Sequence, residues 1–335
     1  MIQRFLKLIH HVHAFPKRLV ATSVKPYEGL SDKAHQFVTF LKPDLLHTSG
    51  SLCAILEAIH EHYRDWDIHI QAARVFSGAF LQQRGLIERN YETLDNVSRE
   101  GLCACSEKVK NAIAQQFTQD IDHVLGGHQL LEHFSDLTPS LLRKMTDHHT
   151  THKLGSGVYG FQTLFEDKPL LCLNAFYPFL LSSLTPLGGT LIAFLCSSNH
   201  PWDTLRNHFV GGIDPKQATL GSLRRKLFEY RKPLSLLEVN VAHNMIHISP
   251  GPLEALRHIN IFFDAIKTSQ TSFGHCLAKK GFSAKDITFL LTNPCLRKNH
   301  DQETSALFEH TENQNATDVL SLLETLKQEG NLCCP

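Results

Sequence analysis

The sequence lacks several features by which common classes of protein are recognised. Its longest apolar stretches, such as residues 190–196, fall far short of the roughly 20 residues of a membrane helix, so we expect no membrane span. Charge of one sign is not in excess either, because 33 lysines and arginines accompany 33 aspartates and glutamates. Without a net positive charge, no long-range attraction to nucleic acid or to an anionic membrane operates. We therefore expect no nucleic-acid partner, and any anion site must be local.

The nine cysteines include no CxxC pair, the spacing that is typical of zinc ribbons and redox motifs. An odd number of scattered cysteines indicates free thiols in a reducing compartment, so we predict a cytoplasmic protein. Residues 1–27 leave an alternative open, because they hold five basic residues, no acidic residue and apolar residues at helical spacing. This composition is typical of a transit peptide for an organelle such as the mitochondrion. It also fits an amphipathic helix that packs on the domain.

The P-loop motif GxxxxGK[ST] is missing, so a bound nucleotide would be held in another way. A GxGxxG motif does occur at residues 155–160, but no buried strand precedes it and no VAIK, HRD or DFG element follows it. We interpret it as a loop. Residues 147–152, DHHTTH, offer nitrogen ligands without an HExxH pattern, and we predict no metal site in the protein itself.

Hydrophobic patterning predicts an α/β (α+β) chain. Short apolar or alternating runs predict strands at residues 36–41, 67–76, 190–195 and 244–249. Apolar residues at helical spacing predict helices between and after them, at about 51–63, 202–210 and 252–263. This order is that of a ferredoxin-like βαββαβ sheet with helices on its faces.

The domain organisation follows from changes in composition along the chain. Residues 1–35 form an N-terminal extension, which contains the candidate targeting helix. Residues 36–263 hold the βαββαβ domain, interrupted at about 99–167 by a polar, histidine-rich and mainly helical insertion. Residues 264–335 form a C-terminal extension, which is mostly polar and carries a further amphipathic helix at about 319–326.

Five segments of the chain resemble, in their order, the nucleoside diphosphate kinase family. They are QFVTFLKPD at 36–44, TLRNHFVGGIDP at 204–215, GSLR at 221–224, NMIHIS at 244–249 and PLEALRHINIFF at 252–263. They match the family's first strand with its Lys-Pro-Asp, its arginine-bearing helix and G-x-T-[ND]-P loop, its G-[ST]-[IL]-R segment, its N-x-x-H-x-S strand and its closing helix. The resemblance covers about residues 36–95 and 174–263.

The resemblance implies a ping-pong phosphotransferase, in which a histidine takes the γ-phosphate of a nucleoside triphosphate and passes it to a nucleoside diphosphate. His247 falls on that histidine. The residues placed on the family's phosphate and nucleotide contacts are Lys42, Arg206, Arg224, Asn244, Ser249 and Tyr177. Tyr177, or Phe176 beside it, would supply the aromatic face for the base. The family also implies Mg²⁺ carried by the nucleotide and a symmetric homo-oligomer.

Elementary chemistry agrees with this assignment. Phosphoryl transfer spreads negative charge over three oxygens, so one lysine and two arginines are a sensible set of stabilising groups. A neutral imidazole is a competent nucleophile near pH 7. The alternative for His247 is that it is one of 22 histidines and lies in the core for structural reasons.

The sequence departs from the family pattern at several positions. Ile248 and Pro250 replace a glycine and an acidic residue, Ile213 replaces the threonine of G-x-T-[ND]-P, and His258 stands where a glutamate orients the nucleophile. One extra residue precedes Pro215, which leaves the register of Arg206 open. Two hypotheses follow: an active nucleoside diphosphate kinase of reduced activity, or a catalytically inactive family member that acts as a nucleotide-binding sensor or interaction module.

Overall fold

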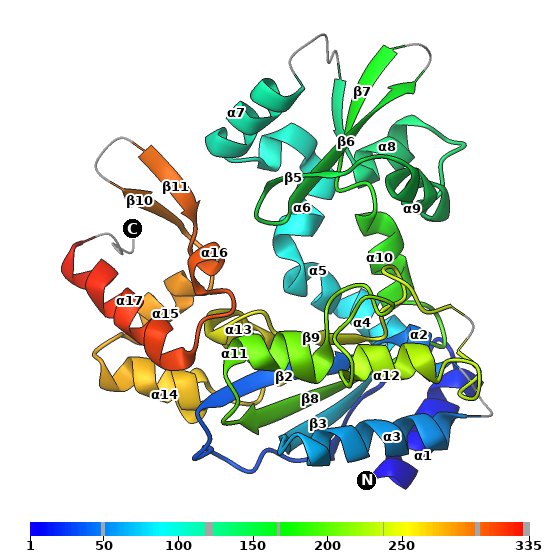
Figure 1. Ribbon diagram of the computed structural model, residues 1–335, viewed down its shortest axis with the longest axis vertical. Helices are drawn as coiled ribbons and strands as arrows, with labels where there is room; N and C mark the ends of the chain where they lie inside the picture. Colours follow the sequence, from blue (N-terminus) through cyan, green and yellow to red (C-terminus); the bar gives the residue numbers. More distant parts are fainter. Residues whose placement is uncertain (48–50, 118–122, 166–167, 237, 299–301, 331–335) are drawn as a thin grey trace. The chain divides into compact units, whose positions relative to one another are not determined.

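The computed structural model of the chain describes residues 1–47, 51–117, 123–165, 168–236, 238–298 and 302–330 (Figure 1). Two units can be separated within it. The first contains Met1–Leu86, Leu184–Arg297 and Ala306–Pro335, and the second contains Ile87–Ser183 and Lys298–Ser305. The insertion predicted at about 99–167 therefore lies inside the second unit, which begins earlier and ends later in the chain.

A five-stranded antiparallel sheet forms the centre of the first unit. Its order is β1-β3-β8-β2-β9, with strands β1 (Ala21–Lys25), β2 (His35–Leu41), β3 (His69–Ser77), β8 (Thr190–Ser198) and β9 (Ile246–Ile248). Without β1, the fourth strand lies beside the first, the first beside the third and the third beside the second. This is the ferredoxin-like arrangement, and the predicted fold class is confirmed. β1 is an added edge strand from the N-terminal extension.

The two central strands are buried on both faces, which explains their continuous apolar sequence. Every residue of β2 and β8 is buried. On β2, Thr39 contacts Tyr63 through hydroxyl oxygens 2.7 Å apart, while the ring of the next residue, Phe40, lies 5.5 Å from that of Phe262. Because successive strand side chains point to opposite faces, α3 (Leu52–Asp65) and α13 (Pro252–Phe262) cover opposite faces of the sheet.

The first helix, α1 (Ile2–Ala14), packs against α3 and β3 (Figure 1). Its buried residues Phe5, Ile9 and Val12 recur at helical spacing, and Phe5 and Ile9 belong to the main hydrophobic core. The basic N-terminal segment is thus an amphipathic helix that packs on the domain. The cellular compartment, cytoplasm or organelle, stays a prediction.

The remaining helices of the first unit connect the strands and form the C-terminal extension. They are α2 (Pro43–Leu46), α4 (Gly78–Arg84), α11 (Trp202–Thr204), η2 (Leu205–Val210), α12 (Leu223–Glu229), η3 (Thr268–Gln270), α14 (Ser272–Lys279), α15 (Ala284–Leu290), α16 (Leu307–Thr311) and α17 (Ala316–Gln328). β10 (Cys295–Lys298) and β11 (Gln302–Ala306) form a two-stranded sheet, and most of β11 is assigned to the second unit. Leu253 and Leu256 of α13 share a hydrophobic core with residues of α14 and α17, so the extension packs on α13.

The second unit contains a four-stranded sheet that the sequence analysis did not predict. Its order is β4-β7-β6-β5, with strands β4 (His123–Gly126), β5 (His152–Gly155), β6 (Val158–Phe165) and β7 (Lys168–Leu173). The helical elements are α5 (Leu86–Asn90), which begins at the boundary, α6 (Glu92–Glu100), η1 (Gly101–Ala104), α7 (Glu107–Gln116), α8 (Gly127–His133), α9 (Pro139–His148) and α10 (Tyr177–Leu184). The GxGxxG motif lies at the turn of the β5–β6 hairpin, where Gly157 has a φ of +65°. Only Ser156 and Gly157 form this turn, while Gly155 ends β5 and residues 158–160 begin β6, so the interpretation as a loop holds for the turn alone.

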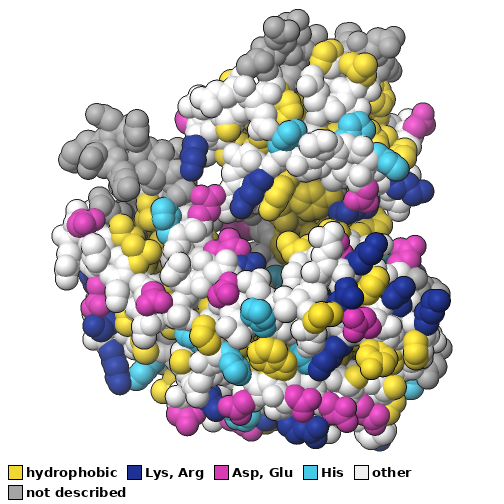
Figure 2. Space-filling model, viewed as in Figure 1, with side chains coloured by type: hydrophobic (Ala, Val, Ile, Leu, Met, Phe, Trp, Pro, Cys, Tyr) yellow, Lys and Arg dark blue, Asp and Glu magenta, His cyan; other side chains and the backbone are white. Residues whose placement is uncertain are grey.

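The distribution of surface charge and the lengths of the helices are relevant to the predictions about nucleic acid and membranes. Acidic and basic side chains are interspersed over the face drawn in Figure 2. Within the described ranges, no helix combines the length and the apolar character that crossing a membrane requires.

Candidate functional site

His247 lies on the edge strand β9, opposite Phe40 of β2. The two rings stack with their centroids 4.3 Å apart and their planes 14° from parallel, so the strand pairing fixes the orientation of the imidazole. The residue as a whole is partly exposed, while Nε2 of its ring is buried. β2 ends where β9 begins. Lys42 directly follows β2, and Asn244 lies two residues before β9. The sheet therefore brings the first and fourth sequence motifs together.

Lys42 and Asn244 contact each other directly, since Lys42 Nζ donates to Asn244 Oδ1 over 2.6 Å. Between Asn244 and His247, Met245 adopts a positive φ of 65°, which is uncommon for a non-glycine residue. Its carbonyl accepts from the Lys42 backbone N–H, and its own N–H donates to Asp44 Oδ2. Backbone strain of this kind persists only where surrounding contacts hold it, and it is common at functional sites.

The ammonium group of Lys42 is buried without a carboxylate partner. Lys42 is 7% exposed, and among the described residues no aspartate or glutamate oxygen pairs with it within 4.0 Å. Burial lowers the pKa of Lys42 to about 8, with Arg224 adding to the fall and Asp44 opposing it. A buried cation held by a neutral amide is costly unless an anion joins it. The position therefore favours binding of an anionic ligand.

Arg224, at the start of α12, is held by the backbone of the site. Its guanidinium donates to the carbonyls of Gly211, Ile246 and Asn244, over 2.7, 2.6 and 3.3 Å. Gly211 has a φ of +97°, and a Cβ there would lie 2.4 Å from Ser222 Oγ, which explains the glycine. At least three of the five N–H donors of Arg224 bind backbone carbonyls, so the main role of this side chain is to hold the backbone segments of the site together.

Arg206 lies on η2, a π-helical turn that follows α11 directly. The N–H of Gly211 donates to the Arg206 carbonyl, five residues back, instead of four. A π-turn accommodates one more residue than an α-turn, which accounts for the extra residue before Pro215. The side chain of Arg206 donates from Nη1 to Glu312 Oε1 over 2.7 Å and to Asn313 Oδ1 over 2.5 Å.

His258 lies next to His247, as the resemblance implies. The ring centroids are 5.2 Å apart, and His258 Nδ1 is 2.9 Å from Ser249 Oγ. Ser249 is in turn hydrogen-bonded to both backbone groups of Val38 on β2. Burial lowers the pKa of His258 to about 3, with Arg257 adding to the fall. His258 is therefore a neutral imidazole that is held in place from β2.

The electrostatic surroundings keep His247 neutral. Burial lowers its pKa well below the ordinary value, and His258, Lys42, Arg224 and Arg206 add to the fall in that order. The geometry agrees, since the Lys42 N–H and the Arg224 guanidinium donate to carbonyls of Met245 and Ile246, and η2, which carries Arg206, packs against β9. An unprotonated imidazole retains the lone pair that nucleophilic attack requires.

Tyr177 belongs to the second unit, and its burial in this structure does not fit the predicted stacking of a base. It lies at the start of α10 in the second unit, its side chain is fully buried, and its ring packs 5.9 Å from that of His128. A base cannot stack on an aromatic ring whose faces are covered. Phe176, the alternative, is only partly buried and its ring lies 5.8 Å from that of Tyr159, so base stacking by Phe176 stays a prediction.

Two carboxyl groups near Arg206 are functional candidates that the sequence analysis missed. Glu312 belongs to the C-terminal extension, and no local motif marks it. Glu254 is 7% exposed, and its Oε2 makes no hydrogen bond to any described residue. Burial raises the pKa of Glu254 to about 8; Glu312 adds to the rise, while Arg206 and Arg257 oppose it. An acidic residue in the first turn of α13 was the signal available in the sequence.

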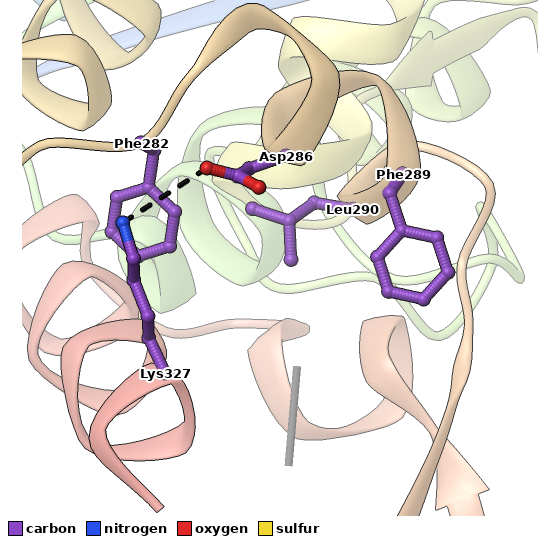
Figure 3. A pocket seen from close by; sticks show the side chains of 5 residues that line it. All are labelled: Phe282, Asp286, Phe289, Leu290 and Lys327. Carbon is purple, nitrogen blue, oxygen red and sulfur yellow. Dashed lines mark ion pairs between the residues drawn. The ribbon is translucent and has the colours of Figure 1, made fainter. Parts of the chain in front are cut away.

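The described residues form no cluster of metal ligands, and a small cavity lies in the C-terminal extension. No three His, Cys, Asp or Glu side chains of the described ranges are grouped so that they could hold a metal ion. A cavity of about 20 Å³ lies between Phe282, Asp286, Phe289, Leu290 and Lys327 (Figure 3). Lys327 Nζ lies 4.5 Å from the centre of the Phe282 ring and 3.9 Å from Asp286 Oδ2. This volume suits one water molecule and not a nucleotide.

The fold and the site together define an α/β protein in which a ferredoxin-like sheet carries a neutral histidine among three basic side chains. No family model and no curated protein matches the chain. Among solved structures it is similar to a nucleoside-diphosphate kinase from Borrelia burgdorferi, described as a transition state mimic with bound vanadate and ADP, and to an NDP kinase from Pyrobaculum aerophilum. Identity is 14% in both comparisons, over 70% of this chain and 89% or 97% of the other. With TM-scores of 0.33 and 0.35, these similarities carry no functional weight by themselves.

Proposed function

We propose that the protein is a phosphotransferase that moves the γ-phosphate of a nucleoside triphosphate to a nucleoside diphosphate through a phosphohistidine on His247. The observation that carries the proposal is the buried ammonium of Lys42, which has no carboxylate partner among the described residues and lies within electrostatic reach of a neutral imidazole. The order of the five sequence motifs supports it independently.

In the first half-reaction, the lone pair of a His247 nitrogen attacks the γ-phosphorus. The bond from that phosphorus to the bridging oxygen breaks, and the nucleoside diphosphate leaves with the electron pair. The second half-reaction is the reverse, with a different diphosphate as acceptor. Lys42 and Arg206 would neutralise the charge that spreads over the phosphoryl oxygens. Mg²⁺ bound to the nucleotide would neutralise further phosphate charge.

Ser249 and His258 would hold the nucleophile. The stack of His247 on Phe40 limits rotation of the ring, and neutral His258 is fixed by Ser249 on the side where the family places a glutamate. A neutral imidazole stabilises the developing positive charge of a phosphorylated ring less than a carboxylate does. We therefore expect slower transfer than a carboxylate would support.

The test is phosphorylation with γ-³²P-labelled ATP and Mg²⁺. The wild type should incorporate an acid-labile, alkali-stable label and pass it to added GDP. His247→Asn should remove the label, because the nucleophile is lost. His60→Asn, an exposed histidine on α3, is the matched control and should label like the wild type. Equal labelling of His247→Asn would contradict the assignment.

A second candidate, a catalytically inactive nucleotide sensor or interaction module, has specific observations in its favour. Arg224 donates to backbone carbonyls, and Arg206 is occupied by Glu312 and Asn313. Ile213 places an exposed apolar side chain where the resemblance implies a hydroxyl donor. Binding of ADP by calorimetry together with no labelled protein would select this candidate. The homo-oligomer is likewise a proposal, and light scattering after gel filtration tests it.

A further inference from the structure

A short segment of the C-terminal extension, residues 311–315, contacts the elements of the candidate site, and we call it the C-terminal clamp. Its Asn315 Oδ1 accepts from the backbone N–H of Trp202, the first residue of the helix that leads to Arg206. Its Asn313 N–H donates to the carbonyl of Pro250, in the loop that joins β9 to α13. The clamp thus contacts the elements that carry Arg206 and His258.

The clamp also lies so close to that loop that position 251 has no room for a side chain. A Cβ added to Gly251 would lie 2.6 Å from the Thr311 carbonyl oxygen, so the glycine permits the contact. Such close backbone packing makes the position of the clamp well defined relative to β9.

Arg206 is held by the clamp on one nitrogen only. Both acceptors, Glu312 Oε1 and Asn313 Oδ1, contact Nη1, which has two hydrogens to give. Among the described residues, Nε and Nη2 make no hydrogen bond, and 24% of the side chain is exposed. Two parallel N–H donors on the same guanidinium are the arrangement that binds two phosphate oxygens at once. The element that carries Arg206, η2, also packs against β9, which carries His247.

We propose that Glu312 and Asn313 are positioning residues, which fix the Arg206 guanidinium so that Nε and Nη2 face the transferred phosphate. The inference rests on the proposed function. An arginine side chain has several rotatable bonds, and ordering them before the ligand arrives removes that entropy cost from the reaction. The C-terminal extension is then part of the phosphate site and not an appendage to it.

The alternative for the same contacts is a plain surface ion pair or a carboxylate that competes with phosphate. The three roles differ in what removal of Glu312 does. A partly exposed ion pair contributes little to stability and nothing to rate. A competitor lowers nucleotide affinity, so its removal raises affinity. A positioning residue raises the rate of phosphoryl transfer, so its removal lowers that rate.

The experiment measures the single-turnover rate of phosphohistidine formation and the Kd of ADP in the full-length protein. Glu312→Ala and Asn313→Ala should each lower the rate about tenfold to a hundredfold, as loss of supporting contacts commonly does. The melting temperature should stay close to that of the wild type. Glu312→Gln keeps the acceptor oxygen without the charge and should restore most of the rate.

The matched control is Glu324→Ala. Glu324 belongs to the same extension, is similarly exposed and pairs with Lys280 over 3.0 Å, away from Arg206. It should leave both measurements unchanged. An unchanged rate in Glu312→Ala and Asn313→Ala, or tighter ADP binding with a faster rate, would overturn the inference while the proposed function stands. A wild type that forms no phosphohistidine would overturn both.

Discussion

His258 is the residue at which this chain departs most clearly from the family it resembles. Two imidazoles lie side by side where the resemblance implies an imidazole and a carboxylate. Repulsion between them requires a charge, and the pKa of His258, lowered to about 3 by burial, keeps its ring neutral at ordinary pH. In the proposed reaction, a neutral histidine at this position supplies no negative charge and adds no positive charge.

Nucleotide affinity should depend on pH in the alkaline range. Lys42 has a pKa of about 8 in the unliganded protein and loses its positive charge above that value. Burial raises the pKa of Glu254 to about 8, with Glu312 adding to the rise and Arg206 and Arg257 opposing it, so Glu254 gains negative charge over the same range. Both changes oppose an anionic ligand, so the Kd of ADP should rise above pH 8, by up to about tenfold per pH unit for each group.

Isothermal calorimetry with ADP between pH 7 and pH 9.5 checks this expectation. Glu254→Gln keeps the size of the side chain and cannot ionise, so its Kd should rise less steeply than that of the wild type. Glu309→Gln, which changes a carboxyl of α16 with no contact to Arg206, serves as the control. A Kd that stays constant up to pH 9.5 would show that neither group acts on the ligand.

At the scale of elements, the side chain of Asn315 links the C-terminal clamp to the first residue of α11. Asn315 is the N-cap of α17, yet its side chain caps no N–H of α17 and accepts from Trp202 instead. Asn315→Ala should lower the free energy of unfolding by about 1 kcal/mol, because a helix N-terminus loses its acceptor. Asn315→Asp keeps an oxygen in place and should preserve most of the stability. Urea unfolding of the three proteins gives these values, and equal midpoints for alanine and wild type would refute the role.

At the scale of the whole molecule, stability should fall in acid. His35, His62 and His258 are buried in the first unit; burial lowers the pKa of all three, to about 4 for His62 and about 3 for His258. In the unfolded chain their pKa is about 6.5. Below pH 6.5 the unfolded state therefore binds more protons, and the free energy of unfolding decreases by up to about 1.4 kcal/mol per pH unit for each group.

Denaturant titrations at pH 7, 6 and 5 measure this loss. Fluorescence is a suitable signal because Trp66 and Trp202 are the only tryptophans of the sequence and both belong to the first unit. His62→Gln removes one of the titrating groups and should weaken the dependence on pH. His60→Gln, on the exposed face of the same helix, should leave it unchanged. Identical slopes for wild type and His62→Gln would contradict the explanation.

Much of the central sheet could be predicted from local pattern. β2 and β8 are buried on both faces, so their sequences are continuous apolar runs that stand out from their surroundings. The strands of the second unit have no such recognisable sequence pattern. β6 mixes buried and exposed positions, and β5 is only four residues long. Short strands with polar, glycine-rich sequences are stabilised by their neighbours, which a local pattern does not show.

The sequence by itself determined the order of the strands and the cluster of Lys42, Asn244 and His247, because residues at the ends of paired strands meet whenever the sheet forms. Only the tertiary structure decided that Tyr177 is buried in another unit and that Glu312, 106 positions from Arg206, holds its guanidinium. It also decided that the imidazoles are neutral. The physical reason is that burial and electrostatic neighbours depend on distance in space, whereas periodicity and motif spacing depend only on distance along the chain.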